Sequence, residues 1–498
     1  MVVLSFVYRL PPLLEAADTN SDAAIVGLQA MHILRGEFAW LLFGSTYQTS
    51  VDSLVAAAWF AVLGPTPFAL MLSALVGHVV LTLLAYGTLA RYVSKACAAW
   101  LVLPLIFCPA AVHGNALYPP RQAALTLVFA ALFVLDGADR ARGARTRAAA
   151  GGVLSVVACF ADPYALIFLP LIGLHLVFAA WGGTRALGAT AARVGAGVVG
   201  MVVGTMPLAL LLSSPGSRHG ETKLTMDVLA HNFAILREAC LPWVLGTKVY
   251  APLHEMDYVP WVAPPAVVAV QWLGVVALGG LLVVAAFAPR VPWAVRRIGL
   301  VGLVAVPLTV GGFLLSPMVM DHFSARYLVA MMLLLPFALA PAAYALTTRR
   351  FAWCVAPYLV SAAVGGWVAY APATEGFAVR TNLSRDDEAM GARLRGLGVH
   401  VAMADYWVAY RETFVFREDP IVVPSHLAQD RYRPYREVFA RGGEYAYLVD
   451  RWRSEESEVT IRERLELAGV RFERIEEGDL VAFVVRAPPG KTPGLASR

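Results

Sequence analysis

Charged side chains are scarce in this sequence. Asp, Glu, Lys and Arg make up 15% of its 498 residues, whereas soluble domains carry about 25%. Hydrophobic residues make up 58% of the chain, and the mean hydropathy is +0.63. Apolar runs of about 20 residues recur, and each is long enough to cross a bilayer as a helix. These features exclude an ordinary soluble protein and predict an α-helical polytopic membrane protein.

Cysteine is also rare, with five residues in the chain. Four of them fall in or at the ends of apolar runs, and none follows Cys354. This distribution excludes a disulfide framework and shows no zinc-ligand spacing. The net charge of +5 is modest, so nothing points to a nucleic-acid partner.

The apolar runs predict about ten or eleven membrane spans. The ten that the sequence defines lie near 65–92, 97–113, 121–138, 148–161, 164–182, 194–213, 263–287, 298–316, 326–346 and 351–372. The loops between them alternate between a basic kind, such as DRARGARTR, and a kind poor in Lys and Arg, such as VHGNALYPP. Basic loops stay cytoplasmic. Residues 1–64, the loop 214–262 and everything after 372 are therefore expected to face outward.

This topology separates the charges of the membrane region. Residues 1–372 hold 14 acids, of which only Asp136 and Asp139 fall on the cytoplasmic side. Thirteen of the 21 Lys and Arg residues fall on that side. Ionisable groups at membrane level are costly and are often functional. Acids and a few bases thus converge on one outer surface, although outward loops can also be polar simply because they are wet.

The composition changes from about residue 373. Residues 373–498 hold 40 of the 75 charged residues. Stretches such as VHVAMAD, EYAYLVD and LVAFVVR predict strands, and DDEAMGARLRGLG and ESEVTIRERLELAG predict helices. Helix and strand alternate, and no glycine-rich phosphate loop occurs. A soluble extracytoplasmic α/β domain is expected over 373–486, followed by a disordered tail over 487–498.

The first outward loop, residues 1–64, has a distinctive order of parts. SDAAIVGLQAMHILRG predicts a helix with Ser21 or Asp22 at its N-cap, and such a helix can lie in the membrane interface. The turn-like FGSTYQTS follows, and then a second apolar stretch, VDSLVAAAWFAVLG. Only after these parts does the first clear span begin.

These motifs resemble the GT-C superfamily of integral membrane glycosyltransferases. Within it they are similar to bacterial relatives of protein O-mannosyltransferases and of the lipid A aminoarabinose transferase. In that group an acidic pair opens the first loop, and a helix ending in HIL-x-G, an aromatic-Gly-x-x-Tyr turn and an Ala-rich helix follow. ARYLVAM and ADYWVAY in this chain also look like the group. One departure stands out, because the Asp-Glu pair of the family is Asp22-Ala23 here.

The resemblance implies a fold, a reaction and a location. It implies a GT-C-like helical membrane domain in a bacterial inner (plasma) membrane. It also implies transfer of a sugar from a polyprenyl-phosphate donor to an extracytoplasmic acceptor, which can be a glycolipid, a polysaccharide or a protein. Membrane lipids are further expected partners. No cofactor is implied for certain, and dependence on a divalent metal cation is left open.

The chemistry implied by the family selects candidate site residues. Asp22 is the candidate catalytic base, which would take a proton from the acceptor; the alternative is a plain helix cap. Arg326 and Arg121 are candidate ligands of the lipid phosphate, since each follows an outward loop and a guanidinium binds two phosphate oxygens; the alternative is interfacial anchoring. Arg326 ranks first because it matches the RYL motif. The further candidates for substrate binding are Tyr47, His113, His322 and Asp162, of which Asp162 can also be a turn residue before proline.

Two rival functions remain open at this stage. A transporter or flippase would place charges or broken helices near the bilayer midplane and would show internal repeats; no repeat is visible. A catalytically inactive GT-C-like protein that presents its C-terminal domain is the second, and the loss of the glutamate at Ala23 bears on it. Residues 1–12 are too short to span, so we also expect a spanning helix encoded upstream of Met1.

Overall fold

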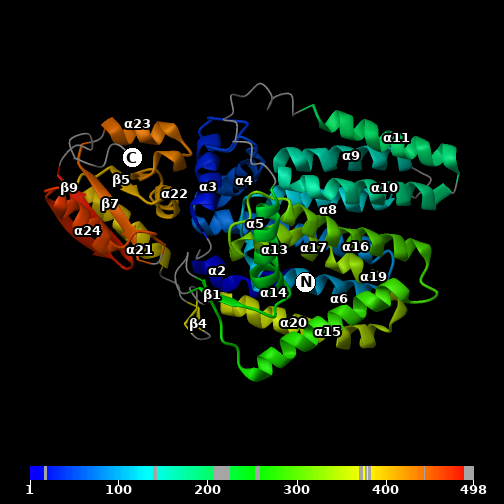
Figure 1. Cartoon of the computed structure of the whole chain (residues 1–498). Helices are drawn as coiled ribbons and strands as arrows, with labels where there is room; N and C mark the ends of the chain where they lie inside the picture. Colours follow the sequence, from blue (N-terminus) through cyan, green and yellow to red (C-terminus); the bar gives the residue numbers. More distant parts are fainter. Residues whose placement is uncertain are drawn as a thin grey trace.

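The structure is a computed structural model that describes residues 1–15, 19–137, 143–184, 186–206, 225–252, 258–369, 374–375, 378–379, 383–441, 443–451 and 453–486. The predicted tail 487–498, Asp18 and residues 214–224 of the predicted outward loop lie outside these residues. A large helical region occupies one side of the molecule, and a sheet domain formed by the C-terminal part of the chain occupies the other (Figure 1). Helices α3 and α4 of the first loop lie between the two (Figure 1).

Seven helical stretches of the described chain are long and apolar enough to cross a membrane. They are α5 (Pro67–Leu89), η3 with α10 (Pro163–Gly182), α11 (Leu187–Gly204), α15 (Pro265–Phe287), α16 (Trp293–Leu314), η5 through α19 (His322–Ala345) and α20 (Thr348–Val368). Each matches one of the predicted spans. The three other predicted spans coincide with α6 (Lys95–Ile106), α8 (Gln122–Asp136) and α9 (Ala144–Ala161). The polytopic helical membrane fold is therefore confirmed.

Small residues let two of these helices touch. A Cβ atom at Gly200 of α11 would lie 2.0 Å from the carbonyl oxygen of Ala149 in α9, and one at Gly152 of α9 would lie 2.1 Å from that of Gly197. Only glycine allows this approach of two backbones, which is a common way of packing membrane helices. The sequence pattern thus explains why α9 and α11 pair.

Two of the spans are made of several short helices. Pro163–Gly182 consists of η3 (Pro163–Phe168) and most of α10 (Leu169–Thr184), and His322–Ala345 consists of η5 (His322–Leu328), α17 (Val329–Leu333), α18 (Leu335–Ala338) and α19 (Ala340–Ala345). Short elements outside the spans are α1 (Val2–Tyr8), α2 (Leu10–Glu15), α7 (Ala110–His113), η1 (Gly114–Ala116), α13 (Met226–Ile235), η4 (Leu236–Cys240), α14 (Leu241–Val244), β1 (Tyr250–Pro252) and β2 (Tyr258–Pro260). Arg9 lies between α1 and α2. Its side chain is fully buried and donates to the Leu105 carbonyl at 3.2 Å.

The C-terminal domain is built on a mixed five-stranded sheet in the order β6-β5-β7-β9-β8. Strand β5 (Val401–Ala404) runs parallel to β6 (Ile421–Pro424) and β7 (Tyr445–Asp450), whereas β9 (Leu480–Val485) pairs antiparallel with β7 and with β8 (Phe472–Glu477). The helices are α21 (Leu383–Gly396), α22 (Tyr406–Val415), α23 (Arg433–Arg441) and α24 (Glu458–Leu467). The expected α/β domain is confirmed, together with two helices, α22 and α23, that the sequence patterns did not predict.

The first loop and the sheet domain share one hydrophobic core. Alternate residues of a strand point to opposite faces, so Val401 and Met403 of β5 join the core formed with α3 (Ser21–Leu34) and α4 (Val51–Leu63). Ala402 and Ala404 join the core on the other face, with α21. As a result every residue of α3 from Ala23 to His32 is buried. The expected surface helix is instead covered, because the C-terminal domain packs on it.

Candidate active site

Asp22 lies in the first turn of α3 and does not cap that helix. The N-cap is Asn20, whose side chain accepts a hydrogen bond from the Ala23 amide at 3.0 Å. The expectation that Ser21 or Asp22 fills this position was therefore wrong. Because the cap is supplied by a neighbour, the half-buried Asp22 carboxylate is available for other partners.

Those partners come from both halves of the molecule. The hydroxyl of Tyr406, the first residue of α22, donates a hydrogen bond to Asp22 Oδ1. The hydroxyl of Tyr118, in the loop before α8, donates to Oδ2 at 3.4 Å. Arg431, which precedes α23, places Nη2 3.5 Å from Oδ1. One carboxylate oxygen thus faces the C-terminal domain and the other faces a loop of the membrane domain.

The two tyrosines remain protonated donors. Burial and the negative charge of Asp22 raise the pKa of the Tyr118 hydroxyl, and the opposing charges of Arg121 and Arg326 do not cancel this rise. Burial and Asp22 raise the pKa of Tyr406 as well, against the effect of Arg431. Both phenols therefore keep their protons at neutral pH and can donate hydrogen bonds to Asp22.

Arg121, Asp162 and Gln48 form a second group of polar side chains. Arg121 places Nε 3.4 Å from Asp162 Oδ2 and its guanidinium 5.3 Å from the centre of the Tyr164 ring. Asp162 also accepts from Gln48 Nε2 at 2.9 Å and from the Tyr164 amide at 2.8 Å. Both of its expected roles, a site acid and a turn residue, are compatible with these contacts. Arg121 is the N-cap of α8 with a φ of 75°.

Asp52 fixes the position of that arginine. Its carboxylate, at the start of α4, accepts hydrogen bonds from the backbone amides of Arg121 at 2.9 Å and Ala123 at 2.8 Å. An acid from the first loop thus binds the N-terminus of a membrane helix, where a negative charge is favourable.

Arg326 has a different environment. It lies in η5, is exposed, donates to the Tyr327 hydroxyl at 3.3 Å and sits 5.2 Å from the centre of that ring. Among the described residues it has no carboxylate partner, whereas the charge of Arg121 is shared with Asp162. Its positive charge nevertheless acts to lower the pKa of the Tyr118 hydroxyl. Arg326 is therefore the freer of the two cations that act on Tyr118.

The three remaining candidate residues, Tyr47, His322 and His113, lie in different surroundings. Tyr47 is 45% exposed and acts on Arg431 electrostatically, so it belongs to the Asp22 group. His322 packs in an aromatic group, with its ring centre 4.7 Å from that of Tyr250 and 5.6 Å from that of Trp243. His113 ends α7, and its side chain lies outside the described residues.

The C-terminal domain holds the start of α3 in place. Arg411 of α22 is fully buried, and its Nε donates to the Thr19 carbonyl at 3.0 Å. The Ser21 hydroxyl donates to the Trp407 carbonyl at 2.9 Å and accepts from the Arg411 amide at 3.2 Å. Arg411 itself is paired with Asp387 at 2.7 Å. These contacts surround Asp22 in the sequence, so its position depends on the C-terminal domain.

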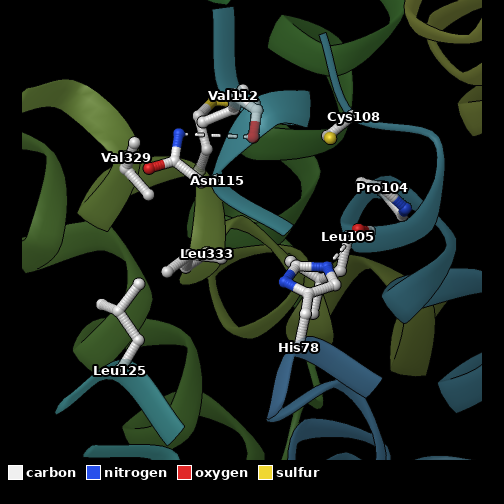
Figure 2. A pocket seen from close by; sticks show the side chains of 10 residues that line it. His78, Pro104, Leu105, Cys108, Val112, Asn115, Leu125, Val329 and Leu333 are labelled. Carbon is white, nitrogen blue, oxygen red and sulfur yellow. Dashed lines mark hydrogen bonds between the residues drawn. The ribbon is translucent and has the colours of Figure 1, made fainter. Parts of the chain in front are cut away.

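A small cavity of about 20 Å³ lies next to the segments that carry these groups (Figure 2). Asn115 of η1 and Val329 and Leu333 of α17 line it, and these segments adjoin Tyr118 and Arg326 respectively. His78 and Cys108 also line it, while most other lining side chains are apolar. An apolar cavity thus opens between the segments that carry the candidate site.

Sequence reasoning missed several members of this site. They are Gln48, Asp52, Tyr118, Tyr406 and Arg431. Asp52 was recognised only as an outward acid, Tyr118 only as part of a loop poor in Lys and Arg, and Tyr406 only within ADYWVAY. The spacing of these residues along the chain carries no signal of their contact.

Among the described residues, no group of three or more His, Cys, Asp or Glu side chains is placed to hold a metal ion. No protein-family model and no curated protein matches the sequence.

Solved structures similar to this chain include two kinds of GT-C glycosyltransferase. ArnT from Cupriavidus metallidurans bound to undecaprenyl phosphate is 13% identical over 100% of this chain and 99% of its own, with a TM-score of 0.46. The Archaeoglobus fulgidus oligosaccharyltransferase in complex with Zn and sulfate is 10% identical over 96% of this chain and 72% of its own, with a TM-score of 0.47. At such low identity the role of each residue rests on the geometry of this chain.

Proposed function

We propose that this protein is a membrane glycosyltransferase of the bacterial inner membrane that moves a sugar from a polyprenyl-phosphate donor to an acceptor outside the cytoplasm. The observation that carries the proposal is the Asp22 carboxylate. Tyr406 and Tyr118 hold it from two sides, and the charge of the exposed Arg326 acts on Tyr118. A base and a phosphate-binding cation are the two groups that this reaction needs.

The residues fit a single displacement. Asp22 takes the proton of the acceptor hydroxyl, and the oxygen forms a bond to the anomeric carbon of the sugar. The bond from that carbon to the phosphate oxygen breaks, and the polyprenyl phosphate leaves with the electron pair. Arg326 stabilises the charge that builds on this phosphate. Displacement in one step inverts the anomeric configuration.

The position of Arg326 supports a lipid-linked donor. Arg326 lies near the start of His322–Ala345, an apolar helical stretch long enough to cross a membrane, so a phosphate at Arg326 would lie at the end of a span, where the phosphate of a membrane lipid sits. Arg121 is a reserve cation, since its pairing with Asp162 at 3.4 Å is long for an ion pair.

The same features weigh against a transporter. The charged side chains of this group lie at or before the starts of helices: Asp52 in the first turn of α4, Arg121 at the N-cap of α8 and Arg431 before α23. The alanine at position 23, where the family has a glutamate, is the argument for an inactive protein. Ala23, however, is 1% exposed, and Tyr118 and Tyr406 supply polar partners to Asp22 instead.

The test compares lipids and glycans of the cell envelope by mass spectrometry in cells that carry the protein, lack it, or carry Asp22→Asn. We expect one sugar modification to be present only with the parent protein. A sugar inventory that is identical in all three strains would refute the proposed function.

A further inference from the structure

Arg431 is a cation on the side of Asp22 that faces away from the membrane-domain arginines. It contacts Oδ1, the oxygen bonded to Tyr406, whereas Tyr118 contacts Oδ2 and lies within the field of Arg121 and Arg326. If the donor phosphate occupies the Oδ2 side, as the proposed function requires, the acceptor approaches from the side of Arg431.

The Arg431 guanidinium interacts with the Tyr406 hydroxyl, and its other contacts are long. Its Nη2 lies 3.5 Å from Asp22 and its Nη1 lies 3.4 Å from the Gly44 carbonyl oxygen, both long for charged hydrogen bonds. Other arginines of the C-terminal domain are committed to close pairs, for example Arg451 with Glu476 at 2.6 Å and Arg474 with Glu458 at 2.6 Å. The Arg431 side chain is 35% exposed, so a soluble group can reach it.

Arg431 is also held in position before any ligand arrives. Its amide donates to the Tyr410 hydroxyl at 2.5 Å, and that hydroxyl donates to Asp430 at 3.0 Å. A Cβ atom at Gly44, where φ is 65°, would lie 2.5 Å from the Arg431 Cα atom. Glycine in the FGSTYQTS turn therefore lets the first loop and the Arg431 segment touch, and Tyr47 of the same turn acts on the guanidinium electrostatically.

We propose that Arg431, with the Gly44–Tyr47 turn, forms an acceptor subsite that selects molecules carrying an anionic group, a carboxylate or a phosphate, near the hydroxyl that receives the sugar. A guanidinium fork can take two oxygens of either group. Asp22 repels an anion on one edge of Arg431, so the ligand binds the other edge and its hydroxyl points toward Asp22. The inference rests on the proposed function for the direction of approach.

The experiment measures binding to the purified full chain in nanodiscs by thermal shift at constant ionic strength. The probes are three hexoses: glucose 6-phosphate, glucuronate and glucose. We expect one or both anionic hexoses to raise the unfolding temperature and glucose to leave it unchanged; which anion acts identifies phosphate or carboxylate. Stabilisation by neither anion, or equally by glucose, would overturn the subsite.

Three variants locate the effect. We expect Arg431→Gln to weaken the apparent Kd at least tenfold, and Arg431→Lys to weaken it less because charge is kept without the fork. Arg433→Gln, at an exposed neighbouring position, should bind like the parent. Unchanged binding in Arg431→Gln, or an equal loss in Arg433→Gln, would place the anion elsewhere and contradict the inference.

A parallel titration with undecaprenyl phosphate separates this inference from the proposed function. A parent protein that binds the hexose anion through Arg431 but does not bind undecaprenyl phosphate would contradict the proposed donor and leave the anion subsite standing. Binding of undecaprenyl phosphate without any hexose anion effect would do the reverse.

Discussion

The Tyr406 hydroxyl donates a hydrogen bond to Asp22 across 384 positions of the chain. Tyr406 begins α22 in the C-terminal domain, and Asp22 lies in the first turn of α3. The soluble domain therefore contributes directly to the candidate site and is more than an appendage of the membrane domain. A change in this domain should reach the chemistry through Asp22, which makes its role testable residue by residue.

Asp22→Asn removes the proposed base and keeps the size of the side chain. We expect transfer to fall by roughly 10²–10⁴, the contribution of a general base, while membrane insertion and the unfolding temperature stay near those of the parent. Sugar transfer in membranes and thermal unfolding provide the two readouts. Asn20 supplies the cap of α3, so a loss of transfer cannot be explained by an uncapped helix. Unchanged transfer would show that Asp22 is not the base. Asp18→Asn, outside the matched motif, is the control and should do much less.

Tyr406→Phe removes one hydrogen bond to the base but keeps the ring that faces Trp407 and Tyr410. A hydrogen bond to a charged group is worth about 1.5–3 kcal/mol, so we expect transfer to drop about ten- to a hundredfold, mainly in kcat. Tyr344→Phe, an exposed tyrosine of α19, is the matched control. Equal activity of Tyr406→Phe and the parent would mean that Tyr118 alone is enough to hold Asp22.

Much of the architecture could be predicted because its signals are local. Apolar runs of sufficient length gave the spans, and alternating patterns gave the strands β5 to β9, since strand faces alternate between two cores. Asp22 and Arg326 followed from motifs within single loops. In each case the informative residues lie within a few positions of one another.

Helix α22 could not be predicted in this way. All its residues except Trp407 are buried, so its sequence YWVAYRETFV has no polar face, and its charged pair Arg411 and Glu412 points inward to Asp387 instead of to water. Periodicity fails for a helix buried on all sides. The contacts of Tyr118 and Arg431 with Asp22 join distant parts of the chain and depend on tertiary packing alone.

Gly27→Ala tests the packing of α3 against α22. A Cβ atom at Gly27 would lie 2.8 Å from the ring of Phe414, which stacks on Phe60 with centres 5.8 Å apart. Overpacking of this kind costs about 1–3 kcal/mol, so we expect a lower unfolding temperature and reduced transfer, because α22 also carries Tyr406. Gly396→Ala in α21 has open space around it and should be neutral or slightly stabilising. A Gly27→Ala protein as stable as Gly396→Ala would contradict the close packing.

The contacts of Glu418 with His32 and Arg35 at the end of α3 predict that the packing between α3 and the C-terminal domain depends on pH. Burial would raise its pKa, but hydrogen bonds from His32, Arg35 and Tyr435 lower it from 4.5 to about 2. A lowered pKa stabilises the folded state above the unfolded value, so this contribution is complete above about pH 4.5 and is lost as the pH falls toward 2. We expect Glu418→Gln to be less stable than the parent at pH 7 by on the order of 2 kcal/mol. At pH 3 the difference should shrink, because protonated Glu418 resembles glutamine. The measurement is denaturant unfolding at pH 7 and pH 3. The same stability difference at both pH values would show that the charge of Glu418 does not hold α3 on the C-terminal domain.

Arg326 tests the donor side of the site. It is exposed, and among the described residues it has no carboxylate partner, so its charge is available to a lipid phosphate. Replacement by lysine keeps the charge but loses the two-pronged contact, and replacement by alanine loses both. We therefore expect Arg326→Lys to keep partial activity and Arg326→Ala to lose most of it, chiefly through weaker use of the donor lipid.

The measurement is the KM for the polyprenyl-phosphate sugar together with binding of undecaprenyl phosphate. Arg349→Ala, an exposed arginine at the start of α20, controls for general loss of positive charge. Normal donor binding and turnover in Arg326→Ala would make Arg326 an interfacial anchor and would leave Arg121, freed from Asp162, as the cation to test next.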